Sequence, residues 1–177
     1  MTSAVTIPVL ETERTRLRAP RMSDFKAFAA HCASDRAHFS TGRLNRGQAW
    51  REFSAAVGGW ALQGHGAWSI EARAGGTYWG EIAIMQPAEF PEVELGWTLM
   101  TPAEGKGIAF EAAQAALKWA FAVRGLTTLV SYITPENLRS IRLAERLGAE
   151  HDPAAPLPDG ETANDTVVYR HARGAWA

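Results

Sequence analysis

Cysteine is almost absent from this 177-residue chain, which contains only Cys32. A single cysteine can form neither an intramolecular disulfide nor a cysteine-based metal cluster, and it suits a reducing compartment. The chain also lacks the run of about 18 apolar residues that a membrane span needs, and the segment after Met1 lacks the basic region of a signal peptide. These absences predict a soluble, cytoplasmic protein.

An excess of charge of one sign is also missing. The chain has 18 Lys and Arg residues against 19 Asp and Glu residues, and its formal net charge is -1. Proteins that bind nucleic acid or an anionic membrane usually carry a strongly basic surface. The balance therefore favours a small molecule or another protein as the partner. The length favours one compact domain over residues 1–177.

A histidine pattern typical of a metal site is missing as well. Ligands of a zinc site usually come in closely spaced pairs. The five histidines instead lie on different predicted elements: His31, His38, His65, His151 and His171. We therefore expect no metal cofactor.

Hydrophobic periodicity predicts a mixed α/β chain. Alternation predicts strands over residues 14–19, 67–73, 77–85, 92–100, 126–134 and 165–172, with a short strand before the last one. Helical spacing predicts helices over residues 25–33, 48–63, 108–123 and 135–147. Ser23 and Asn45 are the expected N-caps of the first two helices.

The segment EGKGIAFEA, Glu104 to Ala112, joins a predicted strand to a predicted helix. A tight turn before an ordinary helix is one interpretation. A G-x-G-x-x-G dinucleotide motif fails because Phe110 follows Ala109, and a P-loop fails because no GK[ST] occurs. The free N–H groups and partial positive charge of a helix N-terminus still favour an anion at this junction.

Four segments occur together in family order: TERTRLRAPRMSDF, GEIAIM, VELGWTLMTPAEGKGIAFEAAQAALKWAF and TPENLRSIRLAERLGAE. They resemble the GCN5-related N-acetyltransferase (GNAT) superfamily, in particular its ribosomal-protein N-terminal (RimJ/RimL-like) branch. The resemblance implies the GNAT fold, in which a central twisted mixed sheet of about six to seven strands is splayed at the cofactor cleft and flanked by about four helices. A homodimer is compatible with this resemblance.

The same resemblance implies acetyl-CoA as the acyl donor. In the family, backbone amides of a Q/R-x-x-G-x-G/A loop hold its diphosphate, and Glu104 here stands where Gln or Arg is usual. A carboxylate repels a phosphate, so we expect the Glu104 side chain to point away. The implied cofactor-binding residues are Trp97, Thr98, Leu99, Gly105, Lys106, Gly107, Ile108, Ala109, Asn137 and Ser140.

Acetyl transfer to an amine needs a base for the ammonium and an acid for the departing thiolate. Glu94 is the first candidate for the base, because it lies two residues before Gly96 on the implied cofactor strand. Glu92 is the second candidate, and a chain of waters is a third. Ser140 is the candidate acid, with a water as its alternative.

Two other positions limit which side chains can serve as the catalytic acid or as a covalent nucleophile. Many family members carry a tyrosine acid where this chain has Ala144, so that acid is missing from this position. Cys32 shares the apolar face of a predicted helix, which favours a structural thiol over a covalent nucleophile.

These observations predict an acetyl-CoA-dependent N-acetyltransferase that acts directly on a primary amine, either a protein N-terminal α-amine or a small-molecule amine. The first two helices and residues 86–91 would form the acceptor site, where Trp50, Trp60 and Phe90 either line the site or belong to the core. The alternative is a non-catalytic module that binds acyl-CoA as a sensor or partner-binding subunit.

Overall fold

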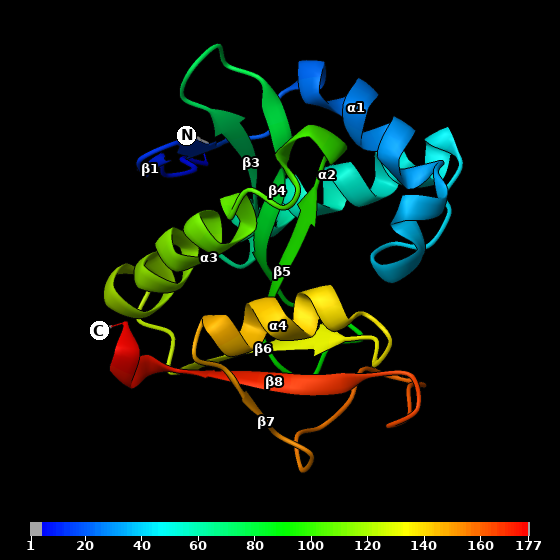
Figure 1. Ribbon diagram of the computed structural model, residues 1–177, viewed down its shortest axis with the longest axis vertical. Coiled ribbons are helices and arrows are strands. Elements are labelled where there is room, and N and C mark those ends of the chain that lie inside the picture. The colour runs from blue at the N-terminus through cyan, green and yellow to red at the C-terminus, as the bar shows by residue number, and fades with distance from the viewer. Residues whose placement is uncertain (1–4, 177) are drawn as a thin grey trace.

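The computed structural model describes residues 5–176, and its strands form one open sheet in the order β1-β2-β3-β4-β5-β6-β8-β7 (Figure 1). Neighbouring strands are antiparallel except β5 and β6, which are parallel. The strands are β1 (Leu10–Glu11), β2 (Thr15–Arg18), β3 (Ala67–Ala72), β4 (Tyr78–Met85), β5 (Glu94–Leu99), β6 (Thr128–Ile133), β7 (Glu150–His151) and β8 (Val167–Ala172).

Within residues 5–176, four α-helices flank this sheet, as the family resemblance implies. They are α1 (Met22–Cys32), α2 (Arg46–Leu62), α3 (Ile108–Lys118) and α4 (Leu138–Arg146). A π-helical turn, Trp119–Val123, extends α3, and a 3-10 helix, η1 (Asp35–Phe39), follows α1. The sheet exceeds the expected six to seven strands because β1 pairs with β2 at one edge; two residues are too few to show an alternating pattern.

The two faces of the sheet are covered by different helices. Helix α3 packs on β2, β4 and β5, and its alanines Ala112, Ala113 and Ala116 are fully buried. Small side chains let a helix approach a sheet closely, which explains why alanines form this face of α3. Helices α1 and α2 contact β3 and β4 instead, with Cys32 fully buried between the two helices, as predicted.

The start of α1 corrects one prediction. The expected N-cap Ser23 lies inside the helix, and Arg21 is the N-cap residue. Asp24 accepts a hydrogen bond from the Arg21 backbone N–H at 2.9 Å. The Asp24 carboxylate also receives two hydrogen bonds from Arg18, a residue of β2, so a buried ion pair fixes where this helix begins.

Strands β5 and β6 touch only at one end. Their register contains the single pair Glu94↔Val130, and beyond it they diverge, so that β6 lies crosswise to β5 (Figure 1). Two side chains complete the hydrogen bonding at this fork: Ser131 Oγ donates to Leu95 O at 2.7 Å, and Tyr132 N donates to Glu94 Oε1 at 3.4 Å. The predicted splay is confirmed.

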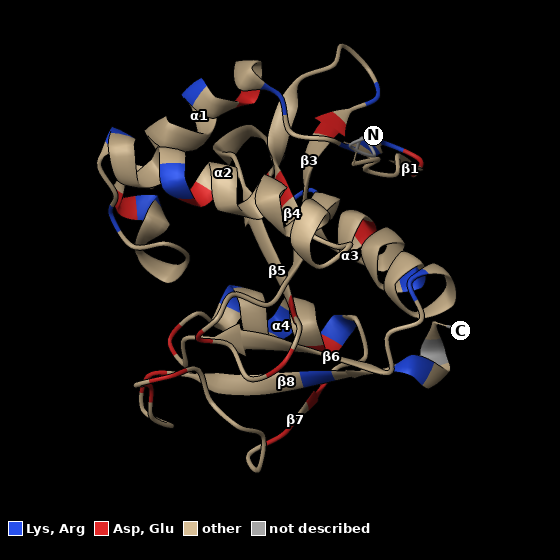
Figure 2. Cartoon of the chain, turned by 180° about the vertical axis from the view of Figure 1, so that it is seen from behind, with Lys and Arg blue, Asp and Glu red and all other residues tan. Residues whose placement is uncertain are grey.

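Both signs of charge are spread over the chain, and basic residues recur along α4 (Figure 2). Within residues 5–176, no helix has the length and apolar character needed to cross a membrane.

Candidate active site

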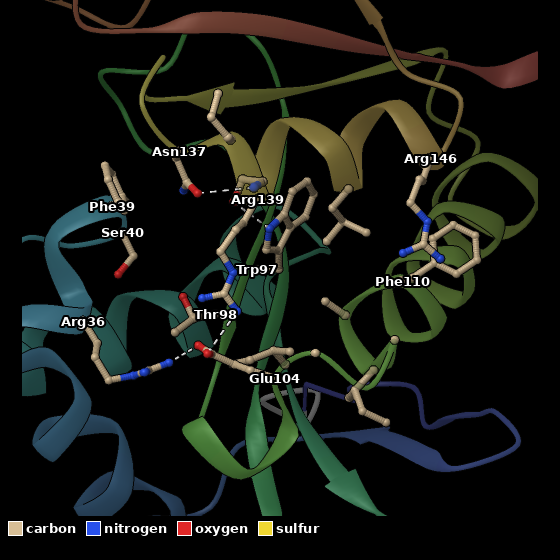
Figure 3. A pocket seen from close by; sticks show the side chains of 18 of the residues that line it. Arg36, Phe39, Ser40, Trp97, Thr98, Glu104, Phe110, Asn137, Arg139 and Arg146 are labelled. Carbon is tan, nitrogen blue, oxygen red and sulfur yellow. Dashed lines mark hydrogen bonds and ion pairs between the residues drawn. The ribbon is translucent and has the colours of Figure 1, made fainter.

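A cleft of about 480 Å³ lies beside the fork, between β5, the loop before α3, and α4 (Figure 3). It brings together most of the predicted cofactor-binding residues: Trp97, Thr98, Leu99, Gly105, Gly107, Ile108, Ala109, Asn137 and Ser140. Lys106 is not among the residues that line it. The Lys106 carbonyl instead accepts a hydrogen bond from Arg14 at 2.8 Å, which anchors the loop.

The backbone of β5 presents hydrogen-bonding groups to the gap. Leu95 O faces β6, where it accepts from Ser131, whereas Met100 N bonds to β4. Because successive peptide groups of a strand point in opposite directions, Trp97 and Leu99 direct their N–H and C=O groups into the gap. Buried backbone groups need partners, and the amides of a pantetheine arm would supply them.

The loop before α3 is shaped to receive an anion. Gly105 and Gly107 have φ values of 69° and 75°, in the left-handed region that glycine adopts without strain. Gly107 is the N-cap of α3 and provides no side chain to bond the first helical N–H groups. These N–H groups are therefore available to a phosphate, and the loop fits the diphosphate of acetyl-CoA.

Glu104 contradicts the expectation that its side chain points away. Its carboxylate lines the cleft and forms ion pairs with Arg36 of η1 and with Arg139 of α4, the latter at 3.0 Å (Figure 3). The physical reason is that two guanidinium groups offset the carboxylate charge, so an anionic side chain is tolerated beside the loop.

Glu94 lies in the fork and does not line the wall of the cleft. Burial raises the pKa of Glu94 to about 7, against the opposing effect of the hydrogen bond from the Tyr132 N–H. Gly96 leaves space above the carboxylate: a Cβ there would come within 3.6 Å of Glu94 Oε2. A carboxyl group that titrates near neutral pH can take a proton from an amine.

The second candidate base, Glu92, is held in an ion pair. Arg170 donates to both of its carboxylate oxygens, at 2.7 and 2.8 Å. A bidentate pair with arginine fixes the position of the carboxylate and occupies both of its oxygens. Glu92 therefore joins β8 to the start of β5 and is a poor candidate for the base.

Asn137 and Ser140 link α4 to β5. Asn137 Oδ1 accepts from the Ser140 N–H at 3.2 Å, so Asn137 caps the helix. Trp97 Nε1 donates to Ser140 Oγ at 3.2 Å, which places this hydroxyl against β5 (Figure 3). Both side chains line the cleft, and Asn137 keeps an amide nitrogen to offer a ligand.

Comparison with known proteins decides the family. The model of the acetyltransferase (GNAT) domain matches residues 14–150, most of the chain. The chain belongs to the GNAT acetyltransferase family. An acetyltransferase from Agrobacterium tumefaciens has the same fold, with a TM-score of 0.88 and 39% identity over 97% of this chain and 98% of that one.

Two further proteins are similar to this chain, one in sequence and one in fold. The uncharacterized N-acetyltransferase YnaD of Bacillus subtilis is 34% identical over 85 residues, which are 47% of this chain and 50% of that protein. The match thus spans half the length of that relative. A candidate ribosomal-protein-serine acetyltransferase from Vibrio cholerae has a TM-score of 0.71, covering 93% of this chain and 97% of that one, but at 22% identity the likeness concerns the fold alone.

The three aromatic residues considered for the acceptor site of this GNAT domain lie in different surroundings. Trp60 is buried in the core, where its ring lies 4.6 Å from that of Trp68, so of its two predicted alternatives the core one holds. Trp50 is 44% exposed and lies against Phe25 at the outer side of α1 and α2. Phe90 packs on Tyr132 at a ring distance of 5.0 Å, and it alone of the three adjoins the fork.

Sequence reasoning missed several charged residues of the cleft. Arg139 and Arg146 lie on α4, at helical spacing from Glu136 and Leu143, and all four line the cleft. Extending the face of Asn137 along this helix would have found them. Arg36 gave no such signal, because η1 brings it to the cleft only through the tertiary fold.

A second buried carboxyl group lies near the cleft. Glu81 of β4 stands opposite Thr98 of β5, and its Oε1 has no hydrogen-bond partner in the described part of the chain. Burial, with a contribution from Asp24, raises the pKa of Glu81 to about 8. Glu81 is therefore the structural rival of Glu94 for the role of base.

We expect Asn137→Ala to have two separable effects. Losing the cap should lower the free energy of unfolding by about 1 kcal/mol. Losing the amide should also weaken CoA binding, measured by isothermal titration calorimetry. Asn137→Ser is the matched control, because a serine caps a helix about as well. It should restore stability but not binding, and recovery of both would show that Asn137 is only a cap.

Proposed function

We propose that this GNAT acetyltransferase transfers the acetyl group of acetyl-CoA directly to a primary amine. The observation that carries the proposal is the position of Glu94, a carboxyl group with a pKa near 7 at the fork, on the same strand whose Trp97 and Leu99 direct backbone groups into the gap. Acetyl-CoA would supply an acetyl group activated as a thioester. The proposal is supported by a carboxyl group and gap-facing backbone groups that belong to one strand, β5.

In this reaction each residue of the site would have a separate role. Glu94 takes a proton from the acceptor ammonium, and the free amine forms the new C–N bond as the C–S bond breaks. A backbone N–H of β5, at Trp97 or Leu99, stabilises the charge that develops on the carbonyl oxygen. The nitrogen must then lose a second proton, which passes through Ser140, or a water bound to it, to the departing thiolate, so that CoA leaves as the thiol. Glu94 releases its own proton to solvent, and atoms and charge balance without a covalent enzyme intermediate.

The pKa of Glu94 bears on the class of amine. A free α-amine has an ordinary pKa of about 7.7–8.0, whereas a lysine side chain has about 10.4. A catalytic base works best when its pKa lies near the operating pH, and at that pH an α-amine loses its proton far more readily than a lysine side chain does. We therefore propose an α-amine, of a peptide N-terminus or of a small molecule, ahead of a lysine side chain.

The test is release of free CoA thiol from acetyl-CoA in the presence of peptides and small amines. We expect turnover with at least one acceptor that carries a free α-amine, and none after that amine is blocked. Measurable CoA binding without turnover for any acceptor would favour the alternative, a sensor that binds acyl-CoA. Absence of CoA binding would overturn both.

A further inference from the structure

Three charged side chains from three elements meet over the cleft (Figure 3). Glu104 immediately precedes the glycine loop, Arg36 belongs to η1, and Arg139 belongs to the first turn of α4. Each arginine is paired with a different oxygen of the Glu104 carboxylate. Since all three side chains line the cleft, this ion-pair bridge joins its η1 side to its α4 side.

Another anion can take the place of the Glu104 carboxylate in this ion-pair bridge. Its side chains are 38% exposed at Arg36, 71% at Arg139 and 23% at Glu104, and ion pairs this exposed to water contribute little to stability. A phosphate offers more charge and more acceptor oxygens than a carboxylate, and the planar guanidinium group binds phosphate through two parallel hydrogen bonds. A phosphate at this place would therefore exchange with Glu104.

The surroundings of the bridge favour an anion as well. Three arginines and two glutamates line the cleft, so its charged side chains carry a positive excess. Gly105, next to Glu104, has open space where a Cβ would stand, and the free N–H groups at the start of α3 begin three residues later, at Ile108. Backbone donors and both arginines thus converge on the same loop.

Building on the proposed function, we propose that Arg36 and Arg139 bind the phosphate groups of the acyl donor, and that Glu104 is an internal anion which those phosphates displace. In the free protein the Glu104 carboxylate holds the two arginine side chains in place, and it releases them when the donor binds. Because Glu104 adjoins Gly105, the phosphates concerned are those held at the glycine loop, that is, the diphosphate of CoA.

Calorimetric titration of the full chain with CoA tests this proposal. Arg139→Ala, and likewise Arg36→Ala, should raise the Kd about tenfold, the effect of losing one charge-assisted hydrogen-bonded contact. Glu104→Gln should lower the Kd about threefold, because the competing charge is gone. Arg142→Ala is the matched control, since Arg142 is exposed on the same helix but does not line the cleft.

Two further ligands separate the phosphate groups. With dephospho-CoA, which lacks the 3′-phosphate but keeps the diphosphate, the effects of Arg139→Ala and Glu104→Gln should persist. With pantetheine, which has no phosphate, both effects should vanish. Equal losses with pantetheine and CoA, or weaker CoA binding by Glu104→Gln, would overturn the proposal. If wild-type protein binds CoA and the arginine variants bind it equally well, the inference fails while the proposed function stands; if wild-type protein does not bind CoA, both fail.

Discussion

Glu94→Gln is expected to lower kcat by about 10²–10⁴-fold, the usual contribution of a general base. Glutamine has nearly the same shape, and its carbonyl oxygen can still accept the hydrogen bond from the Tyr132 N–H. The fork should therefore stay intact, and only the capacity to take a proton is lost. Thermal unfolding and CoA titration of the variant should match those of the wild-type protein.

The pH dependence of kcat/KM tests the same role of Glu94, and its direction follows from the pKa of this residue. Because burial raises the pKa of Glu94 to about 7, the ionised, basic form appears only as the pH rises through that value. The kcat/KM of the wild-type protein should therefore rise through a limb near pH 7, and Glu94→Gln should abolish that limb. Glu81→Gln should preserve it. A limb that survives in Glu94→Gln and disappears in Glu81→Gln would assign the base to Glu81.

Arg18→Ala is expected to destabilise the fold by about 3–5 kcal/mol, the usual cost of leaving buried carboxylates without their partner. Arg18 is 4% exposed and pairs with two carboxylates, Asp24 at 2.7 Å and Glu71 at 2.5 Å. Removing the guanidinium group would leave buried Asp24 without a cationic partner and Glu71 with only the more exposed Arg21 and Arg16, at 3.2 and 3.8 Å. Urea unfolding followed by circular dichroism measures the change.

The pH profile of stability distinguishes this mechanism from lost packing. Burial alone would raise the pKa of Asp24, but hydrogen bonds from Arg18, the Arg21 N–H and Ser69 outweigh it and hold the pKa below its ordinary value. The stabilisation is therefore present above the ordinary pKa and is lost as the pH falls through the lowered value.

In Arg18→Ala this acid-side loss should shrink, because the carboxylates no longer have their partner. Arg16→Ala is the control on the same strand, since Arg16 has a side chain that is 44% exposed. It should cost no more than about 1 kcal/mol. Similar losses in the two variants would contradict the account of the buried network.

The helices and the glycine loop could be predicted from the sequence because the patterns that indicate them involve residues close together in the chain. The alanine spacing of α3 and the Asn45 cap of α2, which accepts from the Gln48 N–H at 2.9 Å, each depend on residues a few positions apart. The same holds for the glycine loop, where a left-handed backbone and a helix start occupy consecutive positions. These features could be predicted without tertiary information.

The features that could not be predicted depend on distant residues. Glu104 meets Arg36 across 68 positions and Arg139 across 35, so its inward orientation was not visible in the local motif. Arg21, not Ser23, is the N-cap of α1, because Asp24 accepts from the Arg21 N–H while Arg18 holds Asp24 in a buried network. Trp60 and Trp50 occur on the same helix, yet only the tertiary fold decides which one is core.

The most direct test of the central claim is a crystal structure of the protein with acetyl-CoA. We expect the diphosphate on the backbone N–H groups that follow Gly107, the pantetheine arm between β5 and β6, and the acetyl group on the side of the fork that holds Glu94. A complex with the donor bound outside the β5–β6 gap, or with its acetyl group remote from Glu94, would contradict the account.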